Sequence, residues 1–223
     1  MFRLTVFPRS LFLLYLMQPL ILGSAVVVLS TQAAHAQNSS TYLDQGIQKS
    51  KRGDYQGAIA DFNKAIQIDQ INANLYYNRG LAKSSSGDSQ GAIADFSMAI
   101  KFFPKDFQAY SNRGIAKRKL GDNQGAIADY SKAIEINPQF AFAYNNRGSA
   151  KYNLKDYQGA IADYSKAIEI DPKFSSAYFS RAFAKAESGD YQAACLDFKK
   201  ASSLGSQNAI NILLELKPTG ACQ

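Results

Sequence analysis

Hydrophobic residues recur along the chain in stripes with the spacing of an α-helix. Between Asp122 and Pro138 the apolar positions fall three and four residues apart, which places them on one helical face. They are Ala126, Ile127, Tyr130, Ala133 and Ile134. A helical segment over residues 109–117 precedes them and ends at Gly121, a residue that can adopt the left-handed conformation that closes a helix. The pattern predicts two helices joined by a short turn, with Asp122 near the start of the second helix and Pro138 ending it.

The same helix pair is repeated along the chain. The block GDYQGAIADF starts at Gly53, and each later copy follows 34 residues after the one before, without an insertion. The later copies start at Gly87, Gly121, Lys155 and Gly189. Such regularity predicts a repeat architecture. The predicted units are 39–72, 73–106, 107–140, 141–174 and 175–208, and a cap follows over 209–223.

Small residues recur at fixed positions of each helix pair. Gly114 in a first helix and Ala126 in a second helix would let the two helices approach closely, and Tyr130 would fill the space beside them. Equivalent residues stand in the other units, at Gly80 and Gly148 among others. Lys155 replaces the turn glycine in the fourth unit. Either that lysine adopts a strained left-handed conformation, or the fourth turn has a different shape.

The 34-residue helix-turn-helix period resembles the tetratricopeptide repeat. The matching residues of the third unit are Tyr110, Gly114, Ala126, Tyr130, Ala133 and Pro138. The resemblance implies an all-α fold: an α-solenoid of five 34-residue helix-turn-helix repeats plus a C-terminal capping helix, wound as a right-handed superhelix. The chain departs from the family pattern at two positions of the first helix. Arg stands in the Leu position (Arg79, Arg113, Arg147, Arg181), and Lys stands in the Tyr position (Lys49, Lys83, Lys117, Lys151, Lys185).

An aspartate recurs in every second helix. These residues are Asp61, Asp95, Asp129, Asp163 and Asp197, and four of them have an arginine in the first helix of the same unit. We predict that Arg113 pairs with Asp129 between helices, and that the other three units repeat this pair. The alternative is that the aspartates are solvated. A catalytic role is disfavoured because a catalytic site needs one asymmetric place, whereas this feature is repeated.

The resemblance implies that first helices line a concave groove that binds extended or helical peptides. Aromatic side chains with neighbouring amides suit such a surface. The asparagines at 78, 112 and 146 could also donate to and accept from a bound backbone. Alternatively, some of the aromatic residues only seal neighbouring units together. The predicted groove residues are Leu43, Ile47, Tyr77, Asn78, Leu81, Gln108, Asn112, Ile115, Phe142, Asn145, Asn146, Tyr152, Phe179 and Phe183.

One branch of the family clamps a C-terminal carboxylate with lysine, arginine and asparagine side chains. The middle asparagine position of that clamp is matched here by Asn112, but its first lysine position carries Ser111 in the third unit. We therefore predict that the chain has no clamp of this kind. Arg118 and Lys119 form a local basic spot that would suit an acidic ligand.

The first 36 residues have the features of a secretory signal peptide. Arg3 and Arg9 precede an apolar run from Leu11 to Leu29, and the small-residue site Ala34-His35-Ala36 follows. We expect cleavage after Ala36, which leaves the repeat domain 37–223 in an extracytoplasmic space: periplasm, lumen or secreted. The alternative is an uncleaved membrane anchor, because the apolar run nearly reaches the length of a membrane span.

The C-terminal segment carries a further predicted helix and two cysteines. Residues 208–216 are mostly apolar and precede Pro218, as expected for a capping helix. Cys195 and Cys222 are the two cysteines of the chain, and an even pair in an oxidising compartment usually forms a disulfide. We predict this bond, with free thiols or an intermolecular bridge as alternatives.

Composition disfavours most catalytic chemistry. The chain has 25 basic and 18 acidic residues and one histidine. Cleavage would remove that histidine and two arginines, leaving 23 basic against 18 acidic residues, a net charge of +5. We predict no catalytic residues, no metal site and no cofactor, and no nucleic-acid partner because acids and bases are interleaved.

The predicted function is an exported, non-enzymatic scaffold that binds peptide segments of other proteins. The alternative is a membrane-anchored assembly factor held by the uncleaved segment. The sequence predicts neither the identity of the partner nor the oligomeric state.

Overall fold

A computed structural model describes residues 38–217 and residue 222. The described chain is helical, with short connections. The predicted signal peptide over 1–36 lies outside the described residues. A helix over residues 38–51 is followed by α3 (Tyr55–Ile68), α4 (Ala73–Ser85), α5 (Ser89–Phe102), α6 (Phe107–Lys119), α7 (Asn123–Ile136), α8 (Ala141–Asn153), α9 (Tyr157–Ile170), α10 (Ser175–Glu187), α11 (Tyr191–Ser203) and α12 (Gln207–Leu216).

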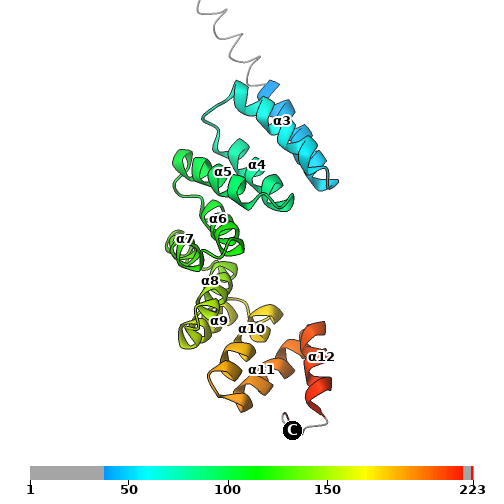
Figure 1. The fold of residues 1–223 in the computed structure, drawn as a ribbon, viewed down its shortest axis with the longest axis vertical. Helices are drawn as coiled ribbons and strands as arrows, with labels where there is room; N and C mark the ends of the chain where they lie inside the picture. The colour runs from blue at the N-terminus through cyan, green and yellow to red at the C-terminus, as the bar shows by residue number, and fades with distance from the viewer. Residues whose placement is uncertain (1–37, 218–221, 223) are drawn as a thin grey trace, which may run out of the picture.

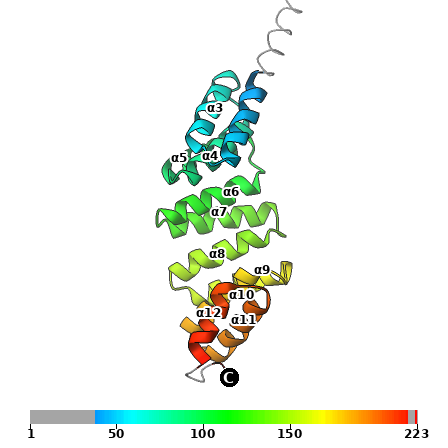
Figure 2. The same ribbon diagram turned by 90° about the vertical axis from the view of Figure 1, so that its right-hand side faces the viewer.

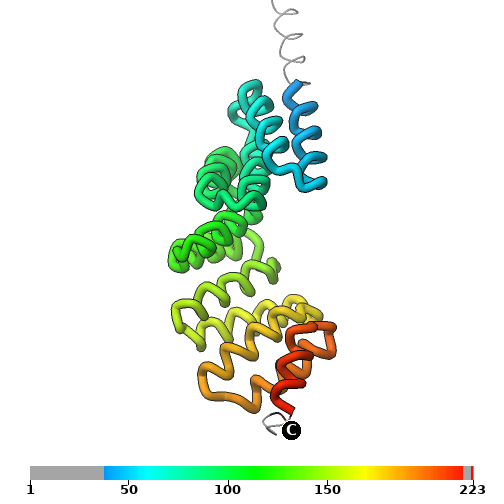
Figure 3. Tube along the Cα trace, turned by 45° about the vertical axis from the view of Figure 1, so that its right-hand side comes forward, coloured from blue at the N-terminus to red at the C-terminus, as the bar shows by residue number. Residues whose placement is uncertain are grey.

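The helices form five antiparallel pairs that stack in chain order, with α12 after the last pair. The stack curves, and α5 and α7 lie on its outer side while α4 and α6 lie towards the hollow side (Figure 1). Seen from the side, successive helix pairs follow one another as layers from α3 to α12 (Figure 2). The Cα trace shows the two ends bending towards the same side (Figure 3). The predicted α-solenoid of five repeats and a capping helix is confirmed.

Each second helix begins at an aspartate, as the sequence predicts. The Asp122 side chain accepts a hydrogen bond from the Gly125 backbone N–H at 2.8 Å, which satisfies one of the free donors at the start of α7. Asp54, Asp88, Asp156 and Asp190 cap α3, α5, α9 and α11 in the same way. The capping aspartates thus set the start of every outer helix at the same point of its unit.

The turn before each of these helices is left-handed, including the turn at Lys155. Gly121 has a φ of 85° and Lys155 a φ of 64°. The expectation that the fourth turn has a different shape is therefore wrong, and the lysine adopts the backbone conformation that glycine adopts elsewhere. The two packed helices on either side, with Asp156 capping α9 as the equivalent aspartates cap the other outer helices, hold the turn in this shape.

The predicted close approach of paired helices is also confirmed. A Cβ atom added to Gly114 would lie 2.8 Å from the Tyr130 ring, closer than carbon atoms pack. The same contact occurs between Gly80 and Phe96, where the distance would be 2.9 Å. The rings of Tyr130 and Phe96 are fully buried, so the absent side chain is what gives the large ring its space.

A charge ladder links the helices along the stack. The Arg113 guanidinium donates to both carboxylate oxygens of Asp129, from Nε at 2.9 Å and from Nη2 at 2.7 Å. The Asp129 side chain is 5% exposed, so the pair is desolvated on the acidic side. The units of Arg79, Arg147 and Arg181 repeat this bidentate pair. The predicted ladder is thus confirmed, and the solvated alternative is wrong.

The ladder contains two further partners that the sequence analysis did not assign. The Lys117 ammonium lies 2.8 Å from Asp129, and the Arg113 Nη1 atom donates to the Ser97 hydroxyl of the preceding unit at 3.0 Å. Arg113 also stacks on the Tyr110 ring, 5.5 Å from its centroid. The arginine therefore joins three helices. In the first unit Gln45 replaces it, and Asp61 pairs with Lys49 at 2.6 Å.

Helix α12 covers the end of the stack, and a disulfide links Cys222, which follows α12, to α11. Ala209 is buried, and Ile212 and Leu213 pack against the cluster around Phe198. The cap begins at Gln207, two residues before the predicted boundary. Cys195 of α11 and Cys222 are paired as a disulfide, with their Cα atoms 5.4 Å apart. Within the described residues, no helix has the length and apolarity needed to cross a membrane.

Candidate functional site

Two hollows open on the inner helices, each between neighbouring units. The hollow between the fourth and fifth units has a volume of about 310 Å³, and its lining is aromatic with hydroxyl groups. It is lined by Ser149, Tyr152, Asn153, Tyr164, Phe179, Ser180 and Phe183. The hollow between the first and second units has a volume of about 270 Å³. It is lined by Ile47, Ser50, Lys51, Tyr55, Asn78, Leu81, Ala82 and Ser85. We call these the C-terminal and the N-terminal hollow.

The two hollows occupy equivalent positions of the repeat. Lys51 and Ser85 of the N-terminal hollow and Asn153 of the C-terminal hollow stand at the same position of their units, separated by multiples of 34 residues. Ser50 and Tyr152 are related in the same way. Because equivalent positions face the same side of a regular stack, both hollows open onto one continuous inner surface.

Six of the predicted groove residues line these hollows. They are Ile47, Asn78, Leu81, Tyr152, Phe179 and Phe183. Some of these six also pack between units: Ile47 packs on the cluster of Ala58, Phe62 and Ala82, which spans the first and second units. Tyr152 packs on a cluster that spans the fourth and fifth units. Phe183 lies edge-on to the buried Phe198 ring of its own unit, with centroids 5.3 Å apart. A residue such as Ile47 or Tyr152 thus packs on a cluster between units and also lines a hollow.

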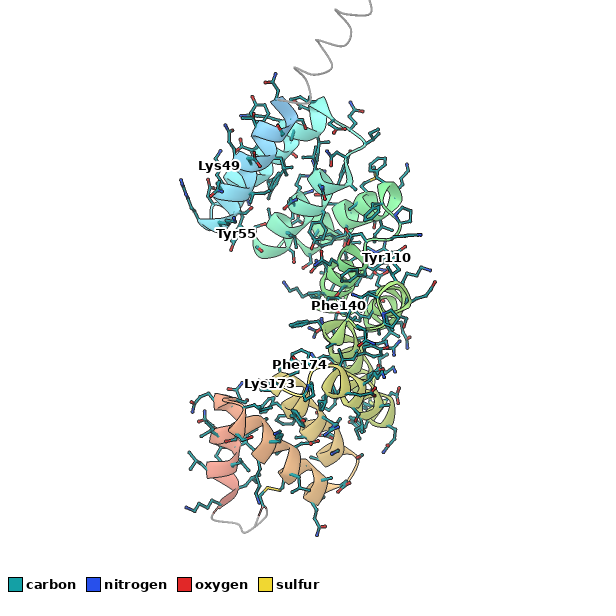
Figure 4. The ribbon with its side chains drawn as sticks, turned by 180° about the vertical axis from the view of Figure 1, so that it is seen from behind. Lys49, Tyr55, Tyr110, Phe140, Lys173 and Phe174 are labelled. Carbon is teal, nitrogen blue, oxygen red and sulfur yellow. A yellow bond between two sulfur atoms is a disulfide. The ribbon has the colours of Figure 1, made fainter. Side chains whose placement is uncertain are left out.

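The remaining apolar predictions differ in their placement. Leu43, Tyr77 and Ile115 are half-buried and pack on the clusters between units. Phe142 is 59% exposed and lies instead in a phenylalanine row, formed by Phe107, Phe140, Phe142 and Phe174. Neighbouring rings of this row are 4.9, 6.1 and 4.8 Å apart. Phe140 and Phe174 lie on the hollow side of the curve (Figure 4). Gln108 is exposed near the start of α6.

The predicted asparagine ladder is partly engaged within the protein. The Asn78 amide donates to the Asn74 carbonyl at 2.8 Å, and the Asn112 amide donates to the Tyr77 hydroxyl at 3.0 Å. Asn146 stands at the same position in the fourth unit and is half-buried. The side-chain oxygens of Asn78 and Asn112 accept none of these bonds, so they keep their capacity to receive a backbone N–H group.

Sequence reasoning missed the Tyr164 hydroxyl of the C-terminal hollow. The Tyr164 hydroxyl donates to the Ser149 hydroxyl at 3.2 Å, and burial raises the pKa of Tyr164 above its usual value. Tyr164 belongs to an outer helix, so a prediction restricted to first helices omitted it. The signal was present in the repeat pattern, because Phe62 and Phe96 carry no hydroxyl at this position whereas Tyr130 and Tyr164 do.

The centre of the inner surface is polar. Burial raises the pKa of Tyr130 to about 12, although the adjacent Arg118 guanidinium opposes part of the rise. Three side-chain atoms of this region are buried without a hydrogen-bond partner among the described residues: Arg118 Nε, Tyr130 Oη and Asn145 Oδ1. Such atoms cost about 1–3 kcal/mol each when left unpaired, so this region has unused hydrogen-bonding capacity.

The acidic side chains of the described residues are held in ion pairs or lie apart from one another. Within this part of the chain, no group of three or more histidine, cysteine or acidic side chains is placed to hold a metal ion. The buried carboxylates are held by arginine and lysine in a repeated arrangement. The hollows of the inner surface present aromatic rings, hydroxyl groups and amides.

Family models match most of the stack. Models described as tetratricopeptide repeat match residues 73–106, 141–174 and 164–195, and a model described as TPR repeat matches residues 50–87 and 116–155. Together these matches reach from the first unit to the fifth. No curated protein sequence matches the chain significantly.

Solved structures resemble the chain over most of its length. The MamA protein is 28% identical, with a TM-score of 0.70, and the match covers 78% of this chain and 95% of that one. YrrB, described as a TPR protein with an unusual peptide-binding site, is 18% identical, with a TM-score of 0.67 and coverage of 82% and 96%. PilF of Pseudomonas aeruginosa is 15% identical, with a TM-score of 0.72 and coverage of 85% and 89%. The last two show the fold alone.

Proposed function

Because the chain belongs to the tetratricopeptide repeat family, we propose that it is a non-enzymatic scaffold that binds peptide segments of partner proteins along its inner helices. The fold supports protein–protein interaction in general. The observation that carries the finer proposal is the pair of hollows at equivalent repeat positions on one surface. An extended peptide with apolar side chains at intervals would fill both hollows and bury its backbone against the amides between them.

The amide side chains that border the hollows also suit the binding of a peptide backbone. Asn153 donates from its side-chain amide to Asn123 of the preceding unit at 3.1 Å, and Asn78 lines the N-terminal hollow. A peptide backbone carries a donor and an acceptor in almost every residue, and these must be satisfied when the peptide is bound. An amide side chain can both donate to and accept from a peptide backbone, so it meets this requirement. The aromatic rings beside the amides supply apolar contact area for the side chains of the peptide.

The test is affinity capture of partners with a variant that blocks both hollows. Ser85→Glu and Asn153→Glu place a carboxylate at the mouth of each hollow and change exposed residues. The matched control is Gln67→Glu with Gln124→Glu, which adds the same charge on exposed sites of the outer helices α3 and α7. We expect the blocking variant to lose partners that the control retains. Equal capture by both variants would refute binding at the hollows.

We further propose that the domain acts outside the cytoplasm after cleavage at Ala36. The basic start, the apolar run and the Ala34-His35-Ala36 site support this proposal. A second candidate, a membrane-anchored assembly factor, is favoured by the length of the apolar run from Leu11 to Leu29. N-terminal sequencing of the protein from its native cells separates the two: a start at Gln37 supports export, and an intact apolar segment in the membrane fraction supports the anchor.

A further inference from the structure

One arginine of the inner helices stands apart from the charge ladder. Arg79, Arg113, Arg147 and Arg181 each hold a buried aspartate. Arg118 makes no ion pair with a carboxylate among the described residues, and its positive charge lowers the pKa values of the nearby Tyr130 and Tyr164 phenols against the effect of their burial. Among the described residues, no carboxylate therefore lies within ion-pair distance of the Arg118 guanidinium.

The repeat places Arg118 on the inner surface between the two hollows. It stands 34 residues before Tyr152, which lines the C-terminal hollow, and 68 residues after Ser50, which lines the N-terminal hollow. Lys119 is related in the same way to Asn153 and Lys51. In a regular stack these positions face one side, so Arg118 and Lys119 project from α6 into the middle of the surface that the hollows share.

The surroundings of Arg118 have hydrogen-bonding groups but no acid to pair with it. Tyr130 is fully buried, and its hydroxyl lacks a partner of good geometry, as do Arg118 Nε and Asn145 Oδ1. The neighbouring inner positions carry the neutral amides of Asn112 and Asn146. A partly desolvated guanidinium in such a site attracts a carboxylate strongly, because water screens their interaction less than on an open surface.

We propose that the inner surface recognises a peptide carboxylate at Arg118 and Lys119, with apolar side chains of the same peptide in one or both hollows. This proposal rests on the proposed function and specifies its ligand as an acidic, apolar peptide segment. The guanidinium donates two N–H groups to the carboxylate oxygens as a fork, and the Lys119 ammonium adds a second positive charge on the exposed side. The carboxylate is either an Asp or Glu side chain or the C-terminus of the partner.

The test is selection from random dodecapeptide libraries with the purified chain. One library ends in a free carboxylate, and the other continues into a neutral linker, so that only side-chain carboxylates are present in its random part. The variant Arg118→Gln with Lys119→Gln is compared with a control, Lys101→Gln with Lys200→Gln. The control removes the same charge from exposed residues of the outer helices α5 and α11.

We expect the unchanged chain and the control to enrich apolar peptides with Asp or Glu, or with a free C-terminus. The Arg118→Gln, Lys119→Gln variant is expected to keep the apolar preference and lose the acidic one. For one selected peptide, replacing the acid by its amide should weaken binding about tenfold to the unchanged chain and hardly at all to the variant.

The outcomes separate this proposal from the proposed function. Selection of apolar peptides with no acidic preference, or with a preference that survives in the variant, overturns the carboxylate site and leaves the groove in place. Selection of no peptide by any form of the chain overturns both. Enrichment in the linker library identifies a side-chain carboxylate, and enrichment confined to the free-ended library identifies the C-terminus.

Discussion

Lys155 shows how a single residue can be held in a conformation that it does not favour. Its φ of 64° lies in the same left-handed region as the φ of 85° at Gly121, the equivalent turn residue of the third unit. A Cβ atom added to Gly121 would have no neighbour within 4 Å. Left-handed backbone costs a residue with a side chain about 1–2 kcal/mol. We expect Lys155→Gly to stabilise the fold by about 1 kcal/mol, measured by chemical denaturation.

The reciprocal change serves as the control for this prediction. Gly121→Lys introduces the same side chain into the equivalent turn, and we expect it to destabilise by a similar amount. If Lys155→Gly left the stability unchanged while Gly121→Lys lowered it, the strain assigned to Lys155 would be wrong.

Tyr130 gives a prediction for alkaline pH. Burial raises its pKa in the folded state to about 12, above the ordinary value of 10. As the pH rises, the unfolded chain therefore loses the phenol proton before the folded protein does. The contribution of the protonated phenol to the free energy of unfolding is complete below pH 10 and is lost as the pH rises towards 12. The loss is at most about 1.4 kcal/mol per pH unit from this group.

Tyr130→Phe should accordingly flatten the decline in stability between pH 10 and 12 without lowering stability at pH 7. Phe62 and Phe96 already occupy the equivalent position, so the ring fits without the hydroxyl. Tyr191→Phe, which changes a ring that is 68% exposed, is the control. A decline as steep in Tyr130→Phe as in the unchanged chain would contradict the burial of this phenol.

The charge ladder operates between helical elements. Asp129 is held by Arg113 and Lys117 of the neighbouring helix, and Arg113 also reaches Ser97 of the preceding unit. Removing both cations by Arg113→Leu with Lys117→Met would leave a buried carboxylate unpaired. We expect a loss of about 3–5 kcal/mol, measured by chemical denaturation.

Adding Asp129→Leu to these two changes should restore much of the lost stability, because the cost comes from the stranded charge rather than from missing contacts. If the variant Arg113→Leu with Lys117→Met lost less than about 1 kcal/mol in its free energy of unfolding, the Asp129 carboxylate would be hydrated once its partners are removed, contrary to this prediction.

The pairs of helices could be predicted because each unit repeats the same helix signals in register. The Arg–Asp pairs were predicted because both residues recur in the same unit. The roles of Lys117 and Ser97 were missed, although constant offsets from Arg113, of four and sixteen residues, carried the signal. The phenylalanine row was missed because only Phe140 and Phe174 share a position of their units. Phe107 and Phe142 stand at two other positions, so the 34-residue period does not reveal the row.

At the scale of the whole molecule, stability depends on how the open ends of the stack are closed. The Cys195–Cys222 bond spans 27 residues and encloses α12. By loop-closure entropy such a bond contributes about 3–4 kcal/mol. We expect reduction, or Cys222→Ser, to lower the unfolding midpoint and to speed amide exchange in α12 first. Unchanged exchange in α12 after reduction would show that packing on Phe198 alone holds the cap.

The two hollows of the inner surface also belong to the scale of the whole molecule, because they exist only where neighbouring units stack. Six of the residues that the sequence predicts for the inner surface line the hollows, since equivalent positions of a repeat share a face. The sequence did not predict which neighbouring units leave a hollow between them. That depends on the side chains filling each junction, such as Ser149 and Tyr164 between the fourth and fifth units.

Site-specific photo-crosslinking in native cells tests the binding surface most directly. A photo-reactive amino acid is placed at Ser85 or Asn153 on the inner helices, and at Gln67 or Gln124 on the outer helices as controls. Binding of peptide segments along the inner helices predicts crosslinks to the same partner from both inner positions and from neither outer position. Crosslinks that come only from the outer positions would contradict it.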